Sequence, residues 1–435
     1  MTGKAPEQLG LAEVVAIGVG GMVGGGIFAV LGLAMDVAGH AVVLSFVFGG
    51  VVALLTGYSY AHLGLAFRDD GGSFTYIEHA FHAPLVAGVA GWLLVAGYVG
   101  TLALYGTAFG AYAAALIAPV APSSLASNLL ASLVLVAFLG INLVGAKLSG
   151  RFELILVVVK VSILLLFVAV GLGTVGTDHL VPVFDKAPVA PLAAAALIFV
   201  AYEGFELIPN AIEEMKNPAD TLKRGLIVSI IVTAALYVLV SFVALGNLTP
   251  EAIRRDQEYA LAVAAQPSLG QFGFVLIGLA ALLSTASAIN ATLFGSSRLA
   301  MVMAREHALP RIFSHRERTR PVPWVGLVAL TAGTVAFILF ANLNVISAFA
   351  SATFLLIFLA VNASAARLHA RVGLKPALPY CGTTLCGVTF LVVLWHTWRV
   401  SPESLAWIVG IYTLAVVSEL GLISLRGARK IHSSR

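Results

Sequence analysis

Three ionisable side chains lie deep inside apolar stretches of this sequence, where an uncompensated charge is costly. Lys160 stands in the apolar segment 154–165, and Glu203 and Glu206 stand in the segment 199–209. A charged side chain at the centre of a bilayer costs about 2.5–3.5 kcal/mol on insertion scales, so such residues usually face the interior of a helix bundle and mark ion or substrate pathways. We therefore predict that these three groups bind protons or a charged substrate.

Lys160 has two interpretations. It follows the expected start of its helix by about 7–9 residues, which at a rise of 1.5 Å per residue is roughly 10–14 Å into the apolar layer. Burial disfavours the charged ammonium, which makes Lys160 a candidate proton carrier. Alternatively, the ammonium only ties its helix to exposed carbonyls of a broken neighbour, and the two roles can coexist.

The two glutamates are three residues apart, so they share a face if the chain between them is helical and diverge if it is not. Glu203 could meet a substrate ammonium or carry a proton itself. Alternatively, it is a carboxylic acid bonded to neighbouring backbone. Glu206 lies further along the segment, and we interpret it as a gating or packing group.

Hydroxyl groups are weaker candidates. Ser284, Thr285 and Ser287 could line an ion or proton site, although such residues in apolar helices also bond to carbonyls of their own helix. Tyr98 and Tyr105 could face a central cavity or pack in the core. Both interpretations stay open for each group.

The composition places all these residues in a membrane protein. The chain has 435 residues, 60% of them hydrophobic and 11% charged, whereas soluble domains have about 45–50% apolar and about 25% charged residues. Apolar runs of about 20 residues, long enough to cross a bilayer as a helix, recur from end to end. The sequence therefore predicts an all-α polytopic membrane protein of twelve helices, at about 10–36, 41–66, 84–117, 124–146, 151–175, 190–213, 225–246, 268–300, 323–341, 344–368, 378–397 and 404–425.

The distribution of charge predicts the orientation. There are 25 Lys and Arg residues against 21 Asp and Glu, a net charge of +4. If the N-terminus is cytoplasmic, the outer loops hold only Lys186, Arg254, Arg255 and Arg399 of these basic residues. By the positive-inside rule, we expect a multi-pass protein of the cell (cytoplasmic) membrane with both termini in the cytoplasm. The basic residues are spread over short loops, so we expect no nucleic-acid partner.

Two of the twelve segments carry signals that interrupt a helix. Residues 18–28 contain six glycines in eleven positions, and residues 199–209 combine two carboxylates with Gly204 and Pro209. Matching breaks in the first and sixth helices, which cross in opposite directions, are typical of secondary transporters built from two inverted repeats. The glycines alone also fit a seam for close helix packing. We expect a single transport domain over residues 1–435, with repeats at about 10–175 and 190–368 and two extra helices at about 378–425.

Enzymatic chemistry is not indicated by any motif. The sequence contains no HExxH, Walker A, GxSxG or dinucleotide-binding pattern. The two cysteines, Cys381 and Cys386, form neither a disulfide framework nor paired zinc ligands. We predict a protein that is not an enzyme, with no cofactor and no metal site.

Three motifs resemble one family of transporters. Residues 20–28, Gly-Gly-Met-Val-Gly-Gly-Gly-Ile-Phe, resemble its G-x-G-I-F signature. Residues 199–206, with Glu-Glu-Met-Lys-Asn-Pro at 213–218, resemble its F-x-A-Y-x-G-F-[DE] and downstream E-E-x-K-N-P, and residues 70–76 resemble its first cytoplasmic loop. By these motifs the chain is similar to the amino acid, polyamine and organocation (APC) permeases, above all to their prokaryotic proton-coupled members. The resemblance implies a LeuT-like fold of inverted repeats with discontinuous helices 1 and 6.

The resemblance also implies where a substrate binds. Its carboxylate would meet backbone N–H groups at the start of a half-helix in the first break, where the helix dipole is positive. Its ammonium would meet carbonyls in the sixth break. With Tyr98 added from the residues themselves, the predicted substrate site consists of Gly24, Gly25, Gly26, Val200, Ala201, Glu203 and Tyr98.

A proton site is implied next to the substrate site. In proton-coupled members a lysine of the fifth helix stands where sodium-coupled relatives hold a cation, and it bonds the first break. Lys160 matches that lysine, with Gly20 as its partner and Ser284 and Ser287 as neighbours. Glu203 departs from the family pattern, because its position is often apolar, and a carboxylate there favours cationic substrates, amines or a protonated resting state.

Together these observations predict a secondary active transporter. We expect proton-coupled symport of small amino acids by alternating access, with Lys160 as the proton carrier and with amino acid, protons and membrane lipid as partners. The first alternative is an exchanger of amino acids or polyamines in which Lys160 is structural. A further alternative is a non-transporting amino acid sensor, and the oligomeric state is not indicated.

Overall fold

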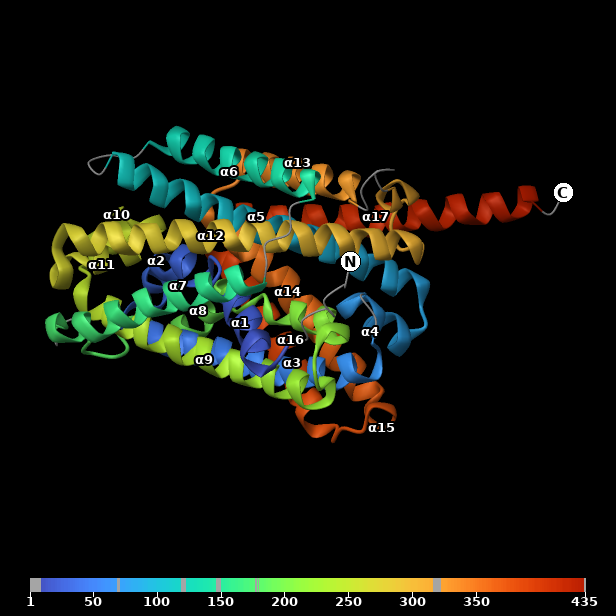
Figure 1. Ribbon diagram of the computed structural model, residues 1–435, viewed down its shortest axis with the longest axis horizontal. Helices are drawn as coiled ribbons and strands as arrows, with labels where there is room; N and C mark the ends of the chain where they lie inside the picture. Colours follow the sequence, from blue (N-terminus) through green and yellow to red (C-terminus); the bar gives the residue numbers. More distant parts are fainter. Residues whose placement is uncertain are drawn as a thin grey trace, which may run out of the picture.

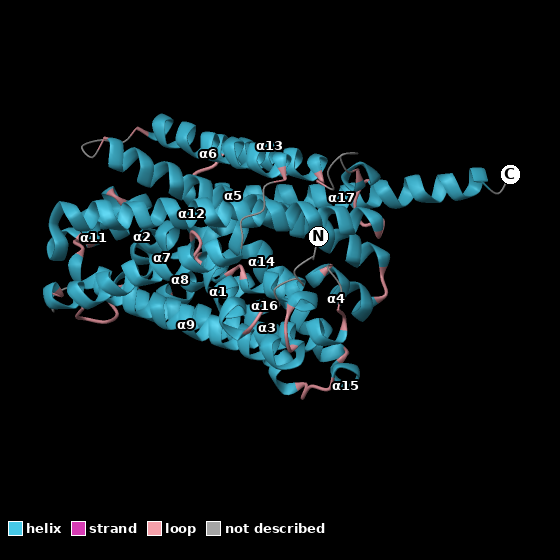
Figure 2. Ribbon diagram, viewed as in Figure 1, coloured by secondary structure: helices cyan, strands magenta, loops and turns pink. Residues whose placement is uncertain are grey.

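The computed structural model describes residues 9–68, 71–118, 123–145, 150–176, 178, 180–315 and 322–433. Within this part of the chain every regular element is a helix, and the only strand-like pairing is a bridge between Leu9 and Met215 (Figure 2). The all-α prediction is confirmed. Asp70 of the loop motif and Lys147 of the predicted cytoplasmic loops lie outside the described residues.

Long helices run side by side along the longest axis of the molecule (Figure 1). They are α3 (Val42–Ala66), α5 (Pro84–Ile117), α6 (Ser124–Val144), α7 (Gly150–Gly171), α9 (Pro218–Asn247), α12 (Gln266–Arg305), α13 (Trp324–Phe340), α14 (Leu343–Arg367), α16 (Ala377–Val400) and α17 (Pro402–Ser433). The shorter elements are α1 (Leu11–Met22), α2 (Gly26–Ala38), α4 (Gly72–Phe81), α8 (Ala190–Leu197), α10 (Pro250–Arg255), α11 (Ala260–Ala264), α15 (His369–Val372) and the 3-10 helices η1 (Gly39–Ala41), η2 (Leu172–Thr174), η4 (Phe199–Tyr202), η5 (Phe205–Glu214), η6 (Gln257–Tyr259) and η7 (Arg311–Ser314).

Each predicted membrane segment coincides with one helix or with a broken pair. Among the described residues, nine helical stretches are long and apolar enough to cross a membrane, and the bent pair of α8 with η4 and η5 makes a tenth. One of the nine, Gly26–Ala66, joins α2 to α3, and two shorter apolar helices, α1 and α13, complete the set. The number of crossings, twelve, stays a prediction. Several helices continue past their predicted ends, because a helix need not stop where the hydrocarbon layer stops.

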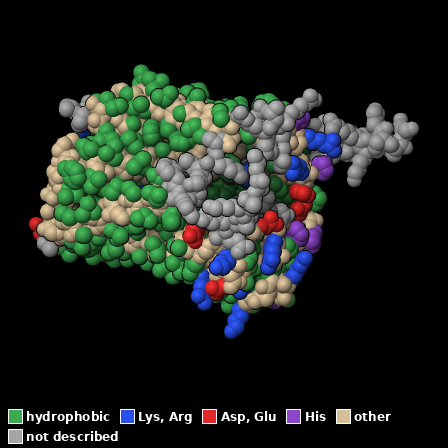
Figure 3. Space-filling view, in the orientation of Figure 1, with side chains coloured by type: hydrophobic (Ala, Val, Ile, Leu, Met, Phe, Trp, Pro, Cys, Tyr) green, Lys and Arg blue, Asp and Glu red, His purple; other side chains and the backbone are tan. Residues whose placement is uncertain are grey.

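The surface fits a lipid environment. Large apolar side chains are exposed on the flanks of α6, α7 and α16, among them Leu129, Leu133, Ile155, Leu391 and Trp398. Figure 3 shows apolar side chains over most of one face, whereas charged and histidine side chains gather at the end that carries α4 and α15. An apolar belt of this extent is unsuited to water and typical of a membrane-spanning bundle.

The half-helices occupy the centre of the bundle. α1 packs on α7 and α9, α2 packs on α8 and α5, and η4 packs on α14. Every residue of α2 from Gly26 to Met35 is buried. A helix that is apolar on all sides belongs in the interior, so the outer helices hold the two broken segments between them.

Candidate functional site

The first predicted segment is broken, as the glycine run indicates. α1 ends at Met22, and its last bonds run from Val23 N–H to Val19 O at 2.8 Å and from Gly24 N–H to Gly21 O at 3.1 Å. α2 then begins at Gly26, with no side-chain cap at Gly25. The first N–H groups of a helix have no partner within it, so the start of α2 brings N–H donors that are not used by the helix, and a positive dipole end, into the core.

Close approach explains the glycines at this break. A Cβ on Gly24 would lie 2.6 Å from the Cβ of Ala288, and a Cβ on Gly26 would lie 2.7 Å from the Cα of Ala201. Both distances are shorter than atoms tolerate. The glycines therefore serve the close packing that a seam requires as well as the interruption, and the two interpretations of the glycine run hold together.

The sixth predicted segment is broken as well. α8 and the 3-10 segment that follows it bend by 57°. At Gly204 φ is +122°, and a Cβ there would lie 2.7 Å from the carbonyl carbon of Gly21. Only glycine combines this backbone conformation with this contact. The two breaks thus touch each other backbone to backbone, which confirms the prediction of discontinuous helices 1 and 6.

Lys160 reaches the first break from α7. Its Nζ donates a hydrogen bond to Gly20 O at 2.8 Å, and the side chain is 2% exposed. From α12, the Ser284 hydroxyl donates to Val23 O. Two outer helices therefore hold carbonyls at the end of α1. Ser287 is half-buried, and no hydrogen bond joins it to the break among the described residues.

The two glutamates are buried at the second break, 1% and 3% exposed for Glu203 and Glu206. The Tyr105 hydroxyl donates to Glu203 Oε2 at 3.2 Å, and the Gly204 N–H donates to Glu206 Oε2 at 2.7 Å. The other oxygen of each carboxyl group, Oε1, meets no hydrogen-bond donor among the described residues. The two carboxyl groups lie close enough to interact electrostatically. The backbone bond that we considered for Glu203 is thus found at Glu206, whereas Glu203 has a tyrosine as its partner.

Comparison with known proteins decides which family has this arrangement. A family model described as amino acid permease matches residues 9–417. The chain belongs to this family. It is 35% identical to the uncharacterized protein MJ0609 of Methanocaldococcus jannaschii, over 90% of each chain. It is 31% identical to the inner membrane transport protein YbaT of Escherichia coli, over 94% of this chain and 95% of that one.

A solved structure supports the fold of the permease. A crystal structure of a manganese transporter mutant of Eremococcus coleocola superposes with a TM-score of 0.60, covering 95% of this chain and 94% of that chain at 14% identity. At this identity the likeness concerns the fold alone. The protein is a membrane transporter of LeuT-like fold and not an enzyme.

Tyrosines surround the centre of the permease. The ring of Tyr105 covers Gly25, since a Cβ on that glycine would lie 2.9 Å from the Tyr105 Cε1. Tyr98 packs edge-on against Phe354 with ring centroids 5.6 Å apart, a contact typical of a core residue. Tyr105 therefore connects the start of α2 with Glu203, and Tyr98 lies close enough to Glu203 and Glu206 to interact with both electrostatically.

Polar groups of α9 and α14 also hold the breaks of the permease. The Tyr237 hydroxyl donates to Met22 O at 2.6 Å and to Ala201 O at 2.9 Å. Ser347 and Ser351 both donate to Leu197 O at 2.8 Å. The sequence did not indicate these residues: an isolated tyrosine in an apolar helix resembles a core residue, and only the i, i+4 spacing of the serines was available as a signal.

Two carbonyls of the predicted ammonium site already accept one hydrogen bond each. Val200 O accepts from the Glu203 N–H at 3.1 Å, and Ala201 O accepts from Tyr237. The Val200 N–H donates to Ser351 Oγ at 3.0 Å. A carbonyl oxygen has two lone pairs, so both groups retain capacity for a further donor.

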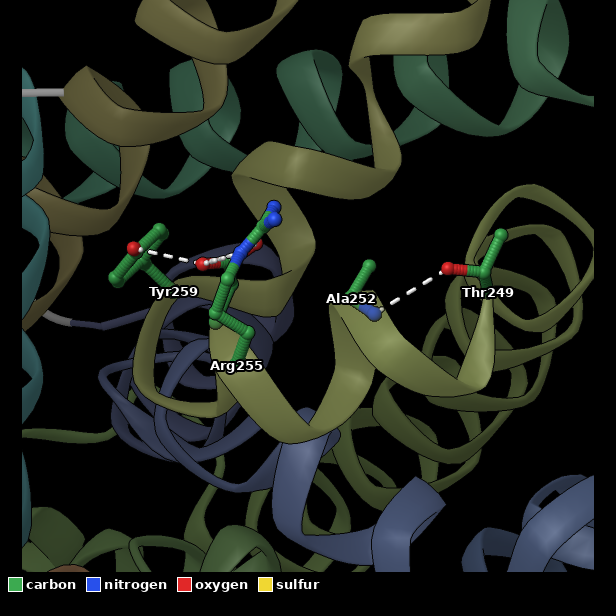
Figure 4. A network of polar contacts seen from close by, with 5 residues as sticks. Thr249, Ala252, Arg255 and Tyr259 are labelled. Atoms are coloured by element: carbon green, nitrogen blue, oxygen red, sulfur yellow. Dashed lines mark hydrogen bonds and ion pairs between the residues drawn. The ribbon is translucent and has the colours of Figure 1, made fainter. Parts of the chain in front are cut away.

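The segment from α10 to α11 covers one end of the permease core. A Cβ on Gly32 of α2 would lie 2.8 Å from Gln257 Cα, so η6 rests directly on α2. Figure 4 shows Arg255 and Tyr259 converging on one carboxylate, that of Asp256, at 2.7 and 2.9 Å, and Thr249 capping α10 through the Ala252 N–H.

Burial raises the pKa of Tyr259 in this cover to about 12, and the hydrogen bond to Asp256 acts in the same direction. The hydroxyl is therefore protonated and donates at neutral pH.

Proposed function

We propose that this permease takes up small amino acids together with protons, by alternating access around its two breaks. The observation that carries the proposal is the hydrogen bond from Lys160 Nζ to Gly20 O at 2.8 Å. A titratable amine thereby holds the half-helix whose neighbour is the predicted substrate site. The protonation state of Lys160 is thus linked by geometry to the position of α1 beside the predicted substrate site.

The substrate carboxylate would bind at Gly24, Gly25 and Gly26, where α2 begins. The support for this assignment is the helix start at Gly25 and Gly26 in the core, which offers N–H donors and a positive dipole end to an anion. The Gly24 N–H, which donates to Gly21 O, would change its partner when the substrate binds. The ammonium would bind the free lone pairs of Val200 O and Ala201 O. An amino acid carries both charges a few ångströms apart, as the two contacting breaks require.

Lys160 would act as the proton carrier. As an ammonium it makes a charge-assisted hydrogen bond to Gly20 O, which is about twice as strong as a neutral one. Loss of the proton would weaken the tie between α7 and α1, while Ser284 would continue to hold Val23 O. The proposed cycle therefore loosens the first break on deprotonation and fastens it on protonation.

The two repeats, residues 10–175 and 190–368, would move against each other in this cycle, and helices 378–425 would lie outside it. We place the permease in a cell membrane with both termini in the cytoplasm. The charge distribution along the sequence supports this orientation.

Uptake into proteoliposomes tests the proposal. A panel of labelled amino acids is offered with and without an inward proton gradient, to the wild type and to Lys160→Ala. Accumulation above equilibrium that needs the gradient and is lost in the variant is the expected result. Uptake that ignores the gradient in the wild type and is unchanged in the variant would contradict symport.

An exchanger of amino acids or polyamines is the second candidate, and one observation favours it. Glu203 and Glu206 are buried, and no Lys, Arg or His forms an ion pair with either among the described residues. A buried carboxylate pair without a cation is suited to a cationic substrate. Counterflow of lysine or a diamine that is abolished in Glu203→Gln, without net gradient-driven uptake in the wild type, would support this candidate.

A further inference from the structure

One face of α7 carries a polar residue at each end of a short stripe. Glu153, Val157 and Lys160 follow one another at spacings of four and three residues, so their side chains line the same face of the helix. All three meet Gly20. A Cβ on Gly20 would lie 2.8 Å from Val157 Cγ2 and 3.9 Å from Glu153 Oε1, and Lys160 Nζ binds Gly20 O.

The stripe leads from the edge of the bundle to its centre. Glu153 lies in the first turn of α7 and is half-buried, whereas Val157 is 6% exposed and Lys160 is 2% exposed. The carboxylate therefore lies on the solvent side and the amine on the interior side. A glycine at position 20 is what lets this face approach α1 so closely.

Glu153 is also the charge that acts on Lys160. Among the described residues, it is the ionisable group that lies close enough to Lys160 to interact with it electrostatically. The helices packed on α7 carry their ionisable groups elsewhere. On α1, Glu13 binds the Gly10 N–H at 3.0 Å. On α9, Arg224 pairs with Asp220 at 2.8 Å.

The remaining ionisable groups of these packed helices are Lys223 and Tyr237 on α9 and Arg298 and Arg305 on α12. The Tyr237 hydroxyl donates to Met22 O and Ala201 O at the breaks. Arg298 lies over the ring of Phe294.

We propose that Glu153 relays the coupling proton between Lys160 and the solution at the α7 N-terminal end. The inference rests on the proposed function of Lys160 as proton carrier. In the step, an N–H bond of the Lys160 ammonium breaks, the proton passes through water that bridges the two side chains, and an O–H bond forms on the Glu153 carboxylate, which leaves a neutral amine and a neutral carboxylic acid. The carboxylic acid then gives its proton to water and regains its charge. With the orientation proposed above, this exit lies on the cytoplasmic side.

The proposed relay can be tested by measuring gradient-driven uptake as a function of pH. The variant Glu153→Gln keeps the size and polarity of the side chain but can neither hold the proton nor stabilise the ammonium. We expect gradient-driven uptake to fall several-fold. We also expect the pH of half-maximal uptake to move down by about one unit, since a nearby opposite charge typically shifts a protonation equilibrium by that much or more. Counterflow, which needs no net proton release, should persist and shows that the variant is folded.

Two variants serve as controls. Glu153→Asp keeps the carboxylate and should restore the wild-type pH profile. Glu251→Gln removes an exposed carboxylate at the other end of the molecule, where it pairs with Arg254 at 3.5 Å, and should change nothing. In a Lys160→Ala background, where gradient-driven uptake is expected to be lost, Glu153→Gln should have no further effect on the pH dependence of counterflow, because the two residues act in series.

The possible results of these experiments distinguish a failure of the Glu153 relay from a failure of the proposed proton symport. A wild-type pH profile that Glu153→Gln leaves unchanged would overturn the relay alone. A change in the pH dependence of counterflow that Glu153→Gln causes in the Lys160→Ala background would also overturn it, since Glu153 would then act without the lysine. A wild type without gradient-driven uptake would overturn both the proposed symport and the relay.

Discussion

Gly204 and Gly21 touch through their backbones at the point where the two broken segments cross. A Cβ on Gly204 would lie 2.7 Å from the carbonyl carbon of Gly21, and φ at Gly204 is +122°. The contact joins segments that are far apart in the sequence. Whatever moves one break must therefore move or release the other, as the proposed alternating access requires.

Gly204→Ala should be strongly destabilising. The substitution forces a side chain into an unfavourable backbone region, which costs about 1–3 kcal/mol, and adds a clash with α1. We expect a lower thermal unfolding midpoint in detergent and loss of uptake. Gly410→Ala is the matched control, since a Cβ there meets nothing within 4 Å, and it should be neutral. Equal behaviour of the two variants would contradict the close crossing.

Tyr237→Phe should weaken the link between the breaks. The variant removes the hydroxyl that donates to Met22 O and Ala201 O, and a buried acceptor left without its donor costs about 1–3 kcal/mol. We expect a lower unfolding midpoint together with a higher KM. Tyr412 serves as the control, because its hydroxyl donates to Thr353 Oγ1 at 3.2 Å and makes no bond to either break. Tyr412→Phe should leave KM unchanged. An unaltered KM in Tyr237→Phe would argue against a role at the site.

The two serines of α14 should differ in importance. Both donate to Leu197 O, but only Ser351 also accepts a hydrogen bond, from the Val200 N–H at 3.0 Å. Ser351→Ala therefore leaves a buried N–H unpaired, at a cost of about 1–3 kcal/mol, whereas in Ser347→Ala the carbonyl keeps its other serine. Thermal unfolding of the two variants should rank Ser351→Ala as the less stable. The reverse order would be inconsistent with these bonds.

Asp256→Ala should loosen the cover at one end of the core. It deprives Arg255 and Tyr259 of their shared partner. We expect a stability loss of about 1–3 kcal/mol from the half-buried Tyr259 hydroxyl left without its acceptor, and little from the exposed Arg255. Glu251→Gln, which alters only an exposed pair, should have little effect.

The pH dependence of this loss follows from Tyr259. Burial raises its pKa from about 10 to about 12, so the folded state holds the proton more tightly than the unfolded state. Its contribution is complete below about pH 10 and is lost only as the pH rises toward 12. The difference between wild type and Asp256→Ala should therefore be the same at pH 6 and pH 9. A marked decline of the difference between those two pH values would contradict the assignment of Tyr259 as donor.

The broken helices could be predicted because their signals are local. Glycine and proline weaken a helix whatever its tertiary contacts are. The first break has a run of glycines near residue 24, and the second has Gly204 and Pro209. The contact of Lys160 with Gly20 followed from the family resemblance and not from the residues, since they are 140 positions apart.

The groups that hold the breaks from outside could not be predicted in this way. Tyr237 and Ser351 belong to ordinary apolar helices, and their partners are set by how helices from different parts of the chain meet. That Ser284 rather than Ser287 bonds the break among the described residues, and that Tyr98 packs against Phe354, has the same origin. A rotation of a helix by a fraction of a turn decides which of several neighbouring side chains reaches its target.

The most direct test of the account measures proton and substrate movement together. Proteoliposomes at zero membrane potential, with a pH-sensitive dye outside, are given a saturating amino acid. We predict that the external solution becomes more alkaline as substrate enters, and that Lys160→Ala abolishes this change while the folded variant still binds substrate. Substrate entry with no proton movement in the wild type would contradict proton coupling through Lys160.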